Sequence, residues 1–247
     1  MNKYLLILLL IISGNISAQM ECVLYGDSTY IAPFAIINDA DGYTNVRDAE
    51  NNIIGQVKEN DIFAVPSYGE YSYPYDYIIW ATKTTQGRYD FDESGLMHHS
   101  RIKYLSQMPM LKRTIKGNTV TFSNKKCQVV IKTGPFEKDK HDITPEKDRM
   151  DGPVTVDGYE VYGIDGIFYS NLKEIKSIWY KINGREYNMP QKYLMGYFSP
   201  NPDNMFVAVG DDGSLFISMT NGDAAGGYGV AWKIKDENVS VVAFRDF

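Results

Sequence analysis

Apolar and polar residues alternate in short runs along most of this chain, with tight polar turns between the runs. In the run at positions 43–47, Thr44 and Val46 share one face of an extended strand. The opposite face carries three residues with polar or aromatic tips, namely Tyr43, Asn45 and Arg47. This period of two, with one apolar face, is typical of a strand that is buried on one side.

Turn signals of the Asp-Gly and Asn-Gly type separate the runs in the second half of the chain. Glycine accepts a positive φ without a Cβ clash, which the two-residue turns of β-hairpins require. The four predicted turns lie at residues 116–118, 157–158, 183–184 and 211–213. Short strands joined by such turns predict an antiparallel β-sandwich or a barrel-like domain.

Three segments depart from the strand pattern. Residues 106–112 hold a proline and two methionines between polar residues, and we interpret them as a linker. Residues 136–151 are rich in Lys, Asp and Glu, which predicts a mobile surface loop. Residues 190–198 begin with a proline, which favours one short helix there.

Composition narrows the classes of function. The chain has 247 residues, enough for two modest domains, and it is 44% hydrophobic with 19 Tyr and 11 Phe. Aromatic residues favour strands, so this composition supports an all-β protein. The formal net charge of −6 gives no basic footprint of the kind that nucleic-acid binding needs, so we expect no nucleic-acid partner.

The first 18 residues predict a secretory signal peptide. Lys3 precedes an apolar run over residues 4–12, and small residues lead up to Ala18, after which we place the cleavage. The alternative, a membrane anchor, would need a longer apolar run. We therefore expect an exported protein, periplasmic or secreted, with no stable membrane span once the signal peptide is removed.

The two cysteines of the chain, Cys22 and Cys127, are candidates for a disulfide, because export permits one. Such a bridge would tie the N-terminal segment to the second half of the chain. Cys127 also alternates with Val129 and Ile131, which predicts a buried position on a strand. The bridge and the buried free thiol both stay open as alternatives.

The string Asp-Gly-Tyr-Thr-Asn-Val-Arg at residues 41–47 resembles the signature of the bacterial SH3-like domains of exported proteins. Residues 54–63 look like the next two strands of that family, and residues 95–102 look like its closing strand and short turn. The resemblance covers residues 36–105 and implies a small SH3-like barrel. It also implies a binding module for cell-wall peptide, for a glycan or for a protein partner. Residues 221–234 resemble the ending of an uncharacterised domain that follows SH3-like domains, a likeness that implies no activity.

Together, the pattern and the resemblance predict two all-β domains in one exported chain. The predicted order is a signal peptide (1–18), an SH3-like domain with an N-terminal extension (19–105), a linker (106–112) and a C-terminal β domain of unknown function (113–247). The first domain is expected to be a small barrel, and the second an antiparallel β-sandwich or a barrel-like fold.

Tyrosines crowd the segment that precedes Trp80. They stand at Tyr68, Tyr71, Tyr73, Tyr75 and Tyr77, and the last four alternate, so an extended segment would place those four on one face. Tyrosine combines a flat apolar ring with a polar tip, which suits a binding surface for sugars or extended peptides. The alternative is that these rings pack on the barrel or on the second domain. Trp80 lies in an apolar run and is expected in the core.

These observations predict one ligand-binding surface, formed by the second strand and the tyrosine segment. Arg47 is its cationic member, because the planar guanidinium suits a carboxylate. The predicted surface consists of Tyr43, Asn45, Arg47, Tyr71, Tyr73, Tyr75 and Tyr77.

Motifs for catalysis and for cofactors are not found in the sequence. No Cys-x-x-Cys and no His-Glu-x-x-His occurs, and the adjacent His98 and His99 would point to opposite faces of a strand. We therefore expect no metal, no cofactor and no catalytic residue, and binding rather than catalysis. One alternative is an envelope-acting hydrolase that uses carboxylates of the second half, Asp211, Asp212 and Asp223. Another alternative, an inhibitor or immunity-type protein, is not separated from a binding module by the sequence.

Overall fold

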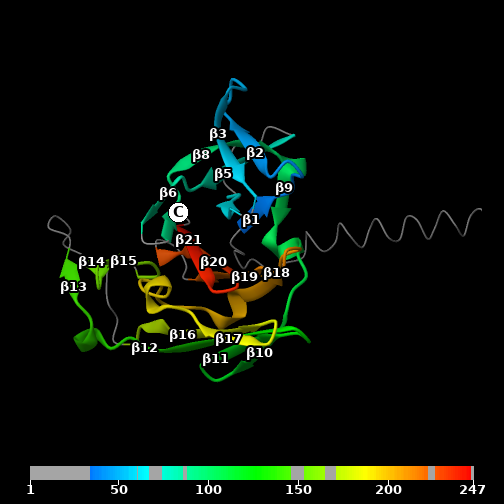
Figure 1. The fold of residues 1–247 in the computed structure, drawn as a ribbon. Coiled ribbons are helices and arrows are strands. Elements are labelled where there is room, and N and C mark those ends of the chain that lie inside the picture. Colours follow the sequence, from blue (N-terminus) through cyan, green and yellow to red (C-terminus); the bar gives the residue numbers. More distant parts are fainter. Residues whose placement is uncertain are drawn as a thin grey trace, which may run out of the picture. The chain divides into compact units, whose positions relative to one another are not determined.

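Strands and short 3-10 helices make up the regular structure of the computed structural model (Figure 1). The described residues are 34–59, 61–66, 74–85, 88–145, 153–164, 171–221 and 226–245. Their strands form four sheets, and no α-helix occurs among them. The predicted all-β class is therefore confirmed. Within these ranges, no helix is long and apolar enough to cross a membrane.

The N-terminal sheet has seven strands in the order β3-β2-β8-β5-β4-β1-β9. Their bounds are β1 Phe34–Ile37, β2 Tyr43–Arg47, β3 Ile53–Lys58, β4 Phe63–Ala64, β5 Tyr75–Trp80, β8 Glu93–His98 and β9 Ile102–Tyr104. On β2, Thr44 and Val46 are buried while the other three residues are partly or largely exposed, as the alternation predicted.

The central sheet has six strands in the order β18-β19-β20-β21-β7-β6. Their bounds are β6 Lys83–Thr85, β7 Arg88–Asp90, β18 Met205–Val209, β19 Leu215–Asn221, β20 Tyr228–Lys235 and β21 Asn238–Arg245. The strands β7 and β21 run parallel, whereas the other neighbouring pairs are antiparallel.

The remaining described strands form an outer sheet and a small sheet, and five 3-10 helices join elements of the fold. The outer sheet, in the order β10-β11-β12-β16-β17, consists of β10 Lys112–Lys116, β11 Thr119–Ser123, β12 Cys127–Pro135, β16 Lys173–Ile182 and β17 Arg185–Asn188. The small sheet consists of β13 Ile143–Pro145, β14 Pro153–Val156 and β15 Tyr159–Glu160. The 3-10 helices are η1 His99–Arg101, η2 Leu105–Gln107, η3 Lys138–Lys140, η4 Gln191–Tyr193 and η5 Pro202–Asn204.

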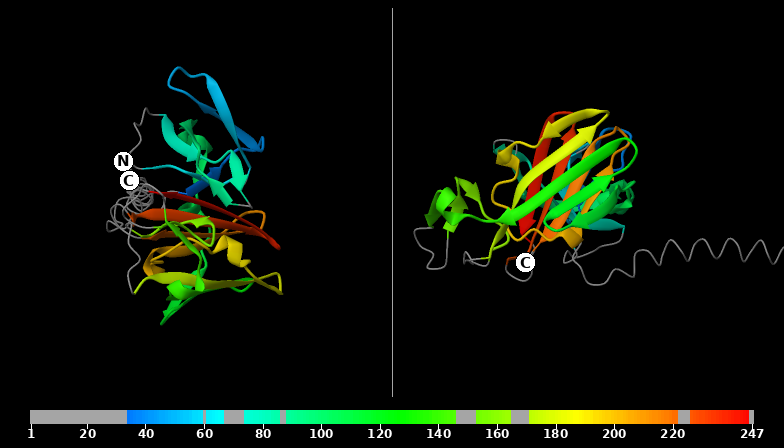
Figure 2. Two further views of the ribbon diagram at one scale, coloured as in Figure 1. Left: turned by 90° about the vertical axis from the view of Figure 1, so that its left-hand side faces the viewer. Right: turned by 90° about the horizontal axis from the view of Figure 1, so that it is seen from below.

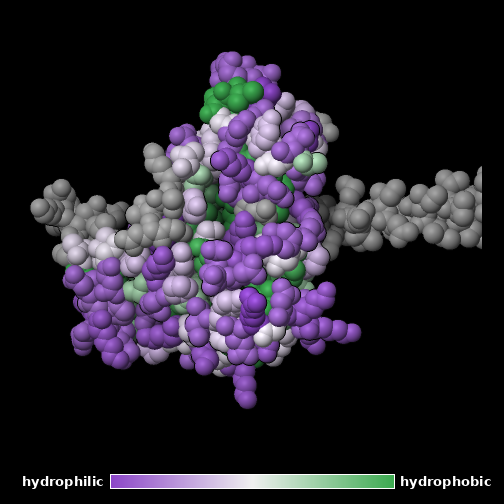
Figure 3. Space-filling view, in the orientation of Figure 1, coloured by the Kyte–Doolittle hydropathy of each residue, from purple (hydrophilic) through white to green (hydrophobic). Residues whose placement is uncertain are grey.

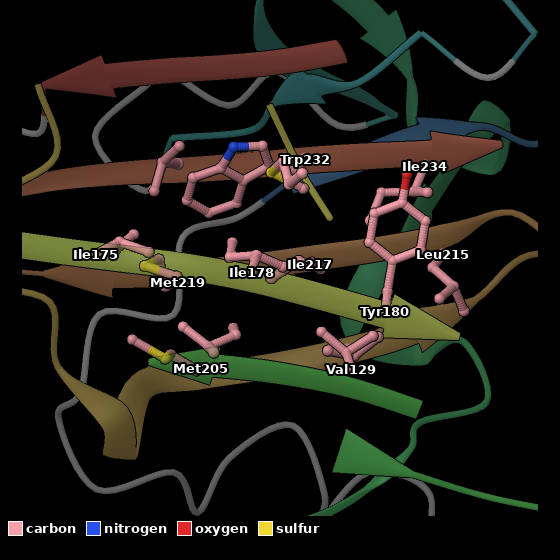
Figure 4. Packing of buried hydrophobic residues seen from close by; sticks show 14 of the residues in the cluster. Val129, Ile175, Ile178, Tyr180, Met205, Leu215, Ile217, Met219, Trp232 and Ile234 are labelled. Atoms are coloured by element: carbon pink, nitrogen blue, oxygen red, sulfur yellow. The ribbon is translucent and has the colours of Figure 1, made fainter. Parts of the chain in front are cut away.

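The central sheet packs with one face on the outer sheet. Ile217 and Trp232 of the central sheet share a core with Val129 and Ile178 of the outer sheet. Figure 4 shows these side chains pointing toward one another between the two layers. Trp232 also donates its indole N–H to the Tyr193 carbonyl oxygen at 2.7 Å, which satisfies a buried polar group.

The other face of the central sheet packs on the N-terminal sheet, so the central sheet lies between two layers (Figure 2). Phe216 and Phe244 share this core with Phe34 of β1, and the rings of Phe34 and Phe244 meet edge-on with centroids 5.6 Å apart. The next residue of β1, Ala35, belongs to a separate core within the N-terminal sheet, together with Ile78. All four residues of β1 are buried because this strand lies between two cores.

Two strands from the first half of the chain belong to the central sheet, which differs from the predicted division into domains. β7 pairs with residues 241–243 of β21. Arg88 on β7 donates from Nη1 to the Met195 carbonyl oxygen at 2.7 Å, and its guanidinium lies 4.7 Å from the centroid of the Tyr197 ring. These long-range contacts tie the two halves together, and Ile31–Phe247 forms one compact unit.

Residues 106–112, the predicted linker, are packed against β18. Met108 and Leu111 are buried. The Leu111 N–H donates to the Val207 carbonyl oxygen, and the Val209 N–H donates to the Pro109 carbonyl oxygen, both at 2.9 Å. Because buried apolar side chains and backbone hydrogen bonds hold the segment, it extends the edge of β18 rather than separating two bodies.

The four predicted hairpin turns are confirmed, since each joins two neighbouring antiparallel strands. At 157–158 and at 183–184 both turn residues have positive φ, between 52° and 81°. This is the backbone that a type I′ turn requires, and it explains why Asp-Gly and Asn-Gly stand there.

Two other segments differ from their predictions. Residues 136–145, predicted as part of a mobile loop, contain η3 and β13. At the start of this segment, Phe136 packs edge-on against Phe198 with ring centroids 4.9 Å apart. The rest of that predicted loop, 146–151, lies outside the described residues. The predicted helix at 190–198 is a single 3-10 turn, η4, followed by further turns.

Candidate functional site

The residues predicted to bind a ligand come from neighbouring strands of the N-terminal sheet. In the sheet order β2-β8-β5, Arg47 lies opposite Leu96, and Leu96 lies opposite Tyr77. Because residues paired across a ladder share a face, these three side chains form one row. Three other residues of the same strands, Val46, Ile78 and Met97, belong to the core behind this row.

A second row lies beside the first on the same face. Tyr75 is paired with His98, and their rings meet edge-on with centroids 5.4 Å apart. On β2, Asn45 stands two residues before Arg47 and accepts a hydrogen bond from Gln56 Nε2 of β3 at 2.9 Å. We call this set the aromatic face, and it consists of Tyr43, Asn45, Arg47, Tyr75, Tyr77, Leu96 and His98.

Solvent reaches the described members of the aromatic face. The side chain of Tyr43 is 45% exposed, and the other members are partly exposed. Two predicted members, Tyr71 and Tyr73, lie outside the described residues, as does Tyr68. The structure therefore brings five of the seven predicted residues onto one face, and the prediction for the other two stays open.

Arg47 is held in its own hairpin. Its Nη1 donates to the Asn51 carbonyl oxygen at 2.8 Å, in the turn between β2 and β3. Asn51 adopts a positive φ of 69° within that turn. Since a guanidinium carries five N–H donors, this bond positions Arg47 while leaving further donor capacity for an anionic ligand.

Trp80 is buried, as predicted, and closes the core behind the aromatic face. Its indole lies against Gly55 of β3, where a Cβ atom would come within 2.7 Å of the ring. A glycine is therefore required at this point for β3 to approach the tryptophan so closely.

The adjacent histidines do not point apart, in contrast to the prediction for a strand. The strand β8 ends at His98, and η1 begins at His99, so the alternation of faces stops between them. Their rings stack with centroids 4.8 Å apart, and His99 Nδ1 lies 2.9 Å from the Pro74 carbonyl oxygen. Burial raises the pKa of the nearby Asp76 carboxyl above its ordinary value, although both histidines oppose that shift. The described residues contain no group of ligands that could hold a metal ion.

A cluster around His141 was missed by the sequence analysis. His141 Nδ1 lies 2.6 Å from Asp157 Oδ2, and its Nε2 lies 3.9 Å from Glu174 Oε1. Glu174 is buried and bonded to Lys176, and Phe136 stacks on the His141 ring with centroids 4.8 Å apart. The residues come from four different elements or turns, so no local pattern in the sequence predicts the cluster. It holds η3 and the small sheet against β16.

Asp157 owes its charge state to this cluster. Burial opposes its ionisation, but the hydrogen bonds from His141 and from the Asp142 N–H outweigh burial, so the Asp157 pKa lies below its ordinary value. Asp157 is also the first residue of a type I′ turn. Both roles are structural, since they fix the turn and the segment that packs on it.

The carboxylates considered for a hydrolase serve as turn residues where they are described. Asp212 accepts hydrogen bonds from the Ser214 N–H at 2.9 Å and from Lys235 at 3.0 Å. Asp211 forms an ion pair of 2.7 Å with Lys103 of β9. Asp223 lies outside the described residues.

Cys127 is buried on β12, as the alternation predicted. Burial raises the pKa of its thiol above the ordinary value, which makes it a poor nucleophile. Cys22 lies outside the described residues, so the disulfide between the two stays a prediction.

Comparisons with known proteins give no family to compare with this geometry. No family model, no curated protein and no solved structure matches the chain.

Proposed function

We propose that this chain is an exported binding protein whose N-terminal sheet is an SH3-like module. Its ligand is a cell-wall peptide, a glycan or an envelope protein, and the aromatic face binds it. The observation that supports this most directly is the row Arg47–Leu96–Tyr77. It joins a cation, an apolar side chain and a tyrosine from three strands on one partly exposed face.

The chemistry of the aromatic face suits a ligand that is both flat and polar. Tyr75 and Tyr77 offer ring surface for a sugar or for an extended peptide, with hydroxyl groups at the tips. Arg47 supplies charge-assisted hydrogen bonds to a carboxylate, such as those of peptidoglycan stem peptides. Asn45, bonded to Gln56, adds a fixed amide beside them.

The expected affinity follows from the surface that these side chains can bury. Full burial of one aromatic side chain stabilises by about 1.5–3 kcal/mol, and the partly exposed rings of this face gain less than that. Micromolar binding needs about 8 kcal/mol. Two or three rings together with one charge-assisted bond therefore support dissociation constants in the micromolar to millimolar range.

Binding of soluble peptidoglycan fragments, purified glycan strands and envelope proteins to the mature chain tests the proposal. Calorimetric titration should give saturable binding to one of these classes. The substitutions Tyr77→Ala and Arg47→Ala should each weaken it by about tenfold, the effect of a central interface residue. The matched control is Tyr187→Ala, which removes a partly buried tyrosine of the outer sheet that stacks on Tyr180.

Two results would contradict the proposal. One is the absence of binding to all three ligand classes. The other is an equal loss of affinity in the Tyr187→Ala control, which would trace the effect to stability rather than to the aromatic face. If the ligand that binds in the titration is an envelope enzyme, and the mature chain lowers the activity of that enzyme, the protein is an inhibitor that uses the same face.

A further inference from the structure

The outer sheet is strongly cationic, although the chain as a whole is acidic. The two segments that form it, residues 112–135 and 173–188, contain eight Lys, two Arg and only two Glu, a formal charge of +8. The rest of the chain holds the other 15 Lys and Arg and the other 29 Asp and Glu, a formal charge of −14. A surface of one sign attracts ligands of the opposite sign and speeds their association.

One face of the outer sheet packs on the central sheet, and the other face meets solvent. Val129 and Ile178 lie on the buried face. Because successive residues of a strand point to opposite faces, the partly exposed Val130 and Trp179 lie on the solvent face. The right-hand view of Figure 2 looks onto this face, with β12 and β16 in front of the central sheet. In Figure 3, hydrophilic side chains cover the lower part of the molecule, where Figure 1 places the outer sheet.

The residues of the solvent face form three rows across the strands, because residues paired in a ladder share a face. The middle row is uncharged and consists of Thr114, Thr121, Val130, Trp179 and Asn188. One flanking row consists of Lys112, Ser123, Gln128, Lys181 and Glu186. The other flanking row consists of Lys116, Thr119, Lys132 and Ser177. We call these three rows the outer face, in which an uncharged row runs between two rows that carry lysines.

Protection of the sheet edges does not account for all of these lysines. Charges on edge strands are the usual defence against pairing with another chain. Lys132 and Lys181, however, lie on β12 and β16, which are inner strands of the sheet. Lys181 forms an ion pair of 3.0 Å with Glu186. Within the described ranges, Lys112, Lys116 and Lys132 form no ion pair, so their charges stay available to a ligand.

Trp179 is the aromatic member of the outer face. It is partly exposed, whereas the other two tryptophans of the chain, Trp80 and Trp232, are buried. A flat ring on an open sheet face suits the apolar side of a sugar ring. The threonine hydroxyls and the Asn188 amide of the same row can exchange hydrogen bonds with sugar hydroxyl groups. The middle row therefore matches a chain of sugar rings, and the flanking rows match negative charge beside that chain.

The spacing of the rows decides how rings and charges must be arranged in the ligand. Successive rows lie about 7 Å apart, since two residues of an extended strand rise by that distance. A sugar ring stacked on Trp179 therefore has Lys181 of one flanking row and Lys132 of the other on its two sides. A carboxylate attached directly to the ring would meet either ammonium group. Acidic peptides and anionic lipids carry charge without such a ring, so they match less of the outer face.

We propose that the outer face binds a linear acidic polysaccharide, whose sugar rings lie along the middle row and whose carboxylate groups meet the lysines of the flanking rows. The middle row crosses all five strands and extends over about 19 Å, since neighbouring strands lie about 4.8 Å apart. It thus offers a track for several sugar units in line. The proposal is independent of the ligand of the aromatic face, because the two faces belong to different sheets.

Titration of the protein with a uronic-acid oligosaccharide, such as oligogalacturonate, tests the proposal. Saturable binding is expected, and it should weaken as the salt concentration rises from about 50 mM to about 200 mM, because salt screens exposed charges. Trp179→Ala should weaken binding by about tenfold, the effect of a central aromatic residue. Trp179→Phe keeps a flat ring and should retain most of the affinity. Circular dichroism confirms that each variant is folded.

A charge substitution tests the flanking rows. Lys132→Gln should weaken binding by about threefold, the usual size of one exposed ionic contact. The matched control is Lys58→Gln, which removes the same charge from an exposed position on β3, outside the outer sheet. The control should leave the affinity unchanged. Equal losses in the two variants would trace the effect to net charge and would overturn the assignment to the outer face.

Tryptophan fluorescence locates the bound ligand. Because Trp80 and Trp232 are buried, a soluble quencher such as acrylamide reaches mainly Trp179. Bound oligosaccharide should cover Trp179 and reduce this quenching. Binding without such protection, or with equal affinity in Trp179→Ala, would overturn the proposal. So would a lack of binding at about 50 mM salt, where screening is weak, or tighter binding of polyglutamate, of anionic lipid vesicles or of a nucleic acid.

Discussion

The central sheet and the N-terminal sheet contain strands of similar length in different surroundings. Every residue of β19 is buried, because the outer sheet covers one face and the N-terminal sheet covers the other. On β2, only alternate residues are buried, and the rest meet solvent. A strand that is covered on both faces has no position left for recognition. The difference therefore locates the candidate binding residues on the sheet that keeps a partly exposed face.

The largest expected effect is on the central sheet. Phe216→Ala removes a fully buried ring from the core between the central and N-terminal sheets, and it should lower the free energy of unfolding by about 3–5 kcal/mol. Urea denaturation followed by fluorescence measures it. The matched control is Phe206→Ala, since Phe206 is a partly exposed phenylalanine that packs against the same core. This substitution should lower the free energy of unfolding by clearly less than Phe216→Ala does. A loss below about 1 kcal/mol for Phe216→Ala would mean that this core does not hold the two sheets together.

A smaller effect is expected at the small sheet, which is held by charges as well as apolar contacts. The Asp157 pKa lies below its ordinary value, so its contribution to stability is present above the unfolded pKa and is lost as the pH falls through the folded pKa. Asp157→Asn should therefore lower the free energy of unfolding by about 1–2 kcal/mol at pH 7, because a charge-assisted hydrogen bond is weakened. In acid the loss should be smaller. Thermal melting from pH 3 to pH 7 measures it. Equal destabilisation at every pH would contradict the charge-based account.

The smallest effect on stability is expected on the aromatic face. Tyr43→Ala removes a largely exposed side chain, so the free energy of unfolding should change by less than about 0.5 kcal/mol. The melting temperature should stay close to that of the wild type. A large drop in the melting temperature would show that the aromatic face contributes to stability. The proposed difference between a buried central sheet and an N-terminal sheet with a face free for binding would then be wrong.

Much of the local structure could be predicted from the sequence, but the long-range pairing could not. The pairs Asp157-Gly158 and Asn183-Gly184 predict their turns, since few other residue pairs accept two positive φ values. The pairing of β7 with β21 joins residues more than 150 positions apart, and no local pattern encodes it. The predicted domain boundary missed it for that reason.

For the candidate site too, the sequence predicted the local arrangement of residues on one strand but not the contacts between separate elements. The alternation on β2 placed Tyr43, Asn45 and Arg47 on one face, because a strand has a fixed period of two. The alternation failed at His98 and His99, where the strand gives way to a 3-10 turn and the two rings stack. The His141 cluster could not be predicted from the sequence for another reason. The two partners of His141, Asp157 and Glu174, come from separate elements of the fold.

Amide hydrogen exchange of the protein, with and without the ligand class that binds in titration, tests the central claim most directly. The account predicts slower exchange on β2, β8 and β5 when the ligand is present, because the ligand covers the aromatic face that these strands form. Exchange on β19 and β20 should stay unchanged, since the central sheet is already buried on both faces. Protection that appears only on the central or outer sheet, with β2 and β5 unaffected, would contradict the claim that the N-terminal sheet is the binding module.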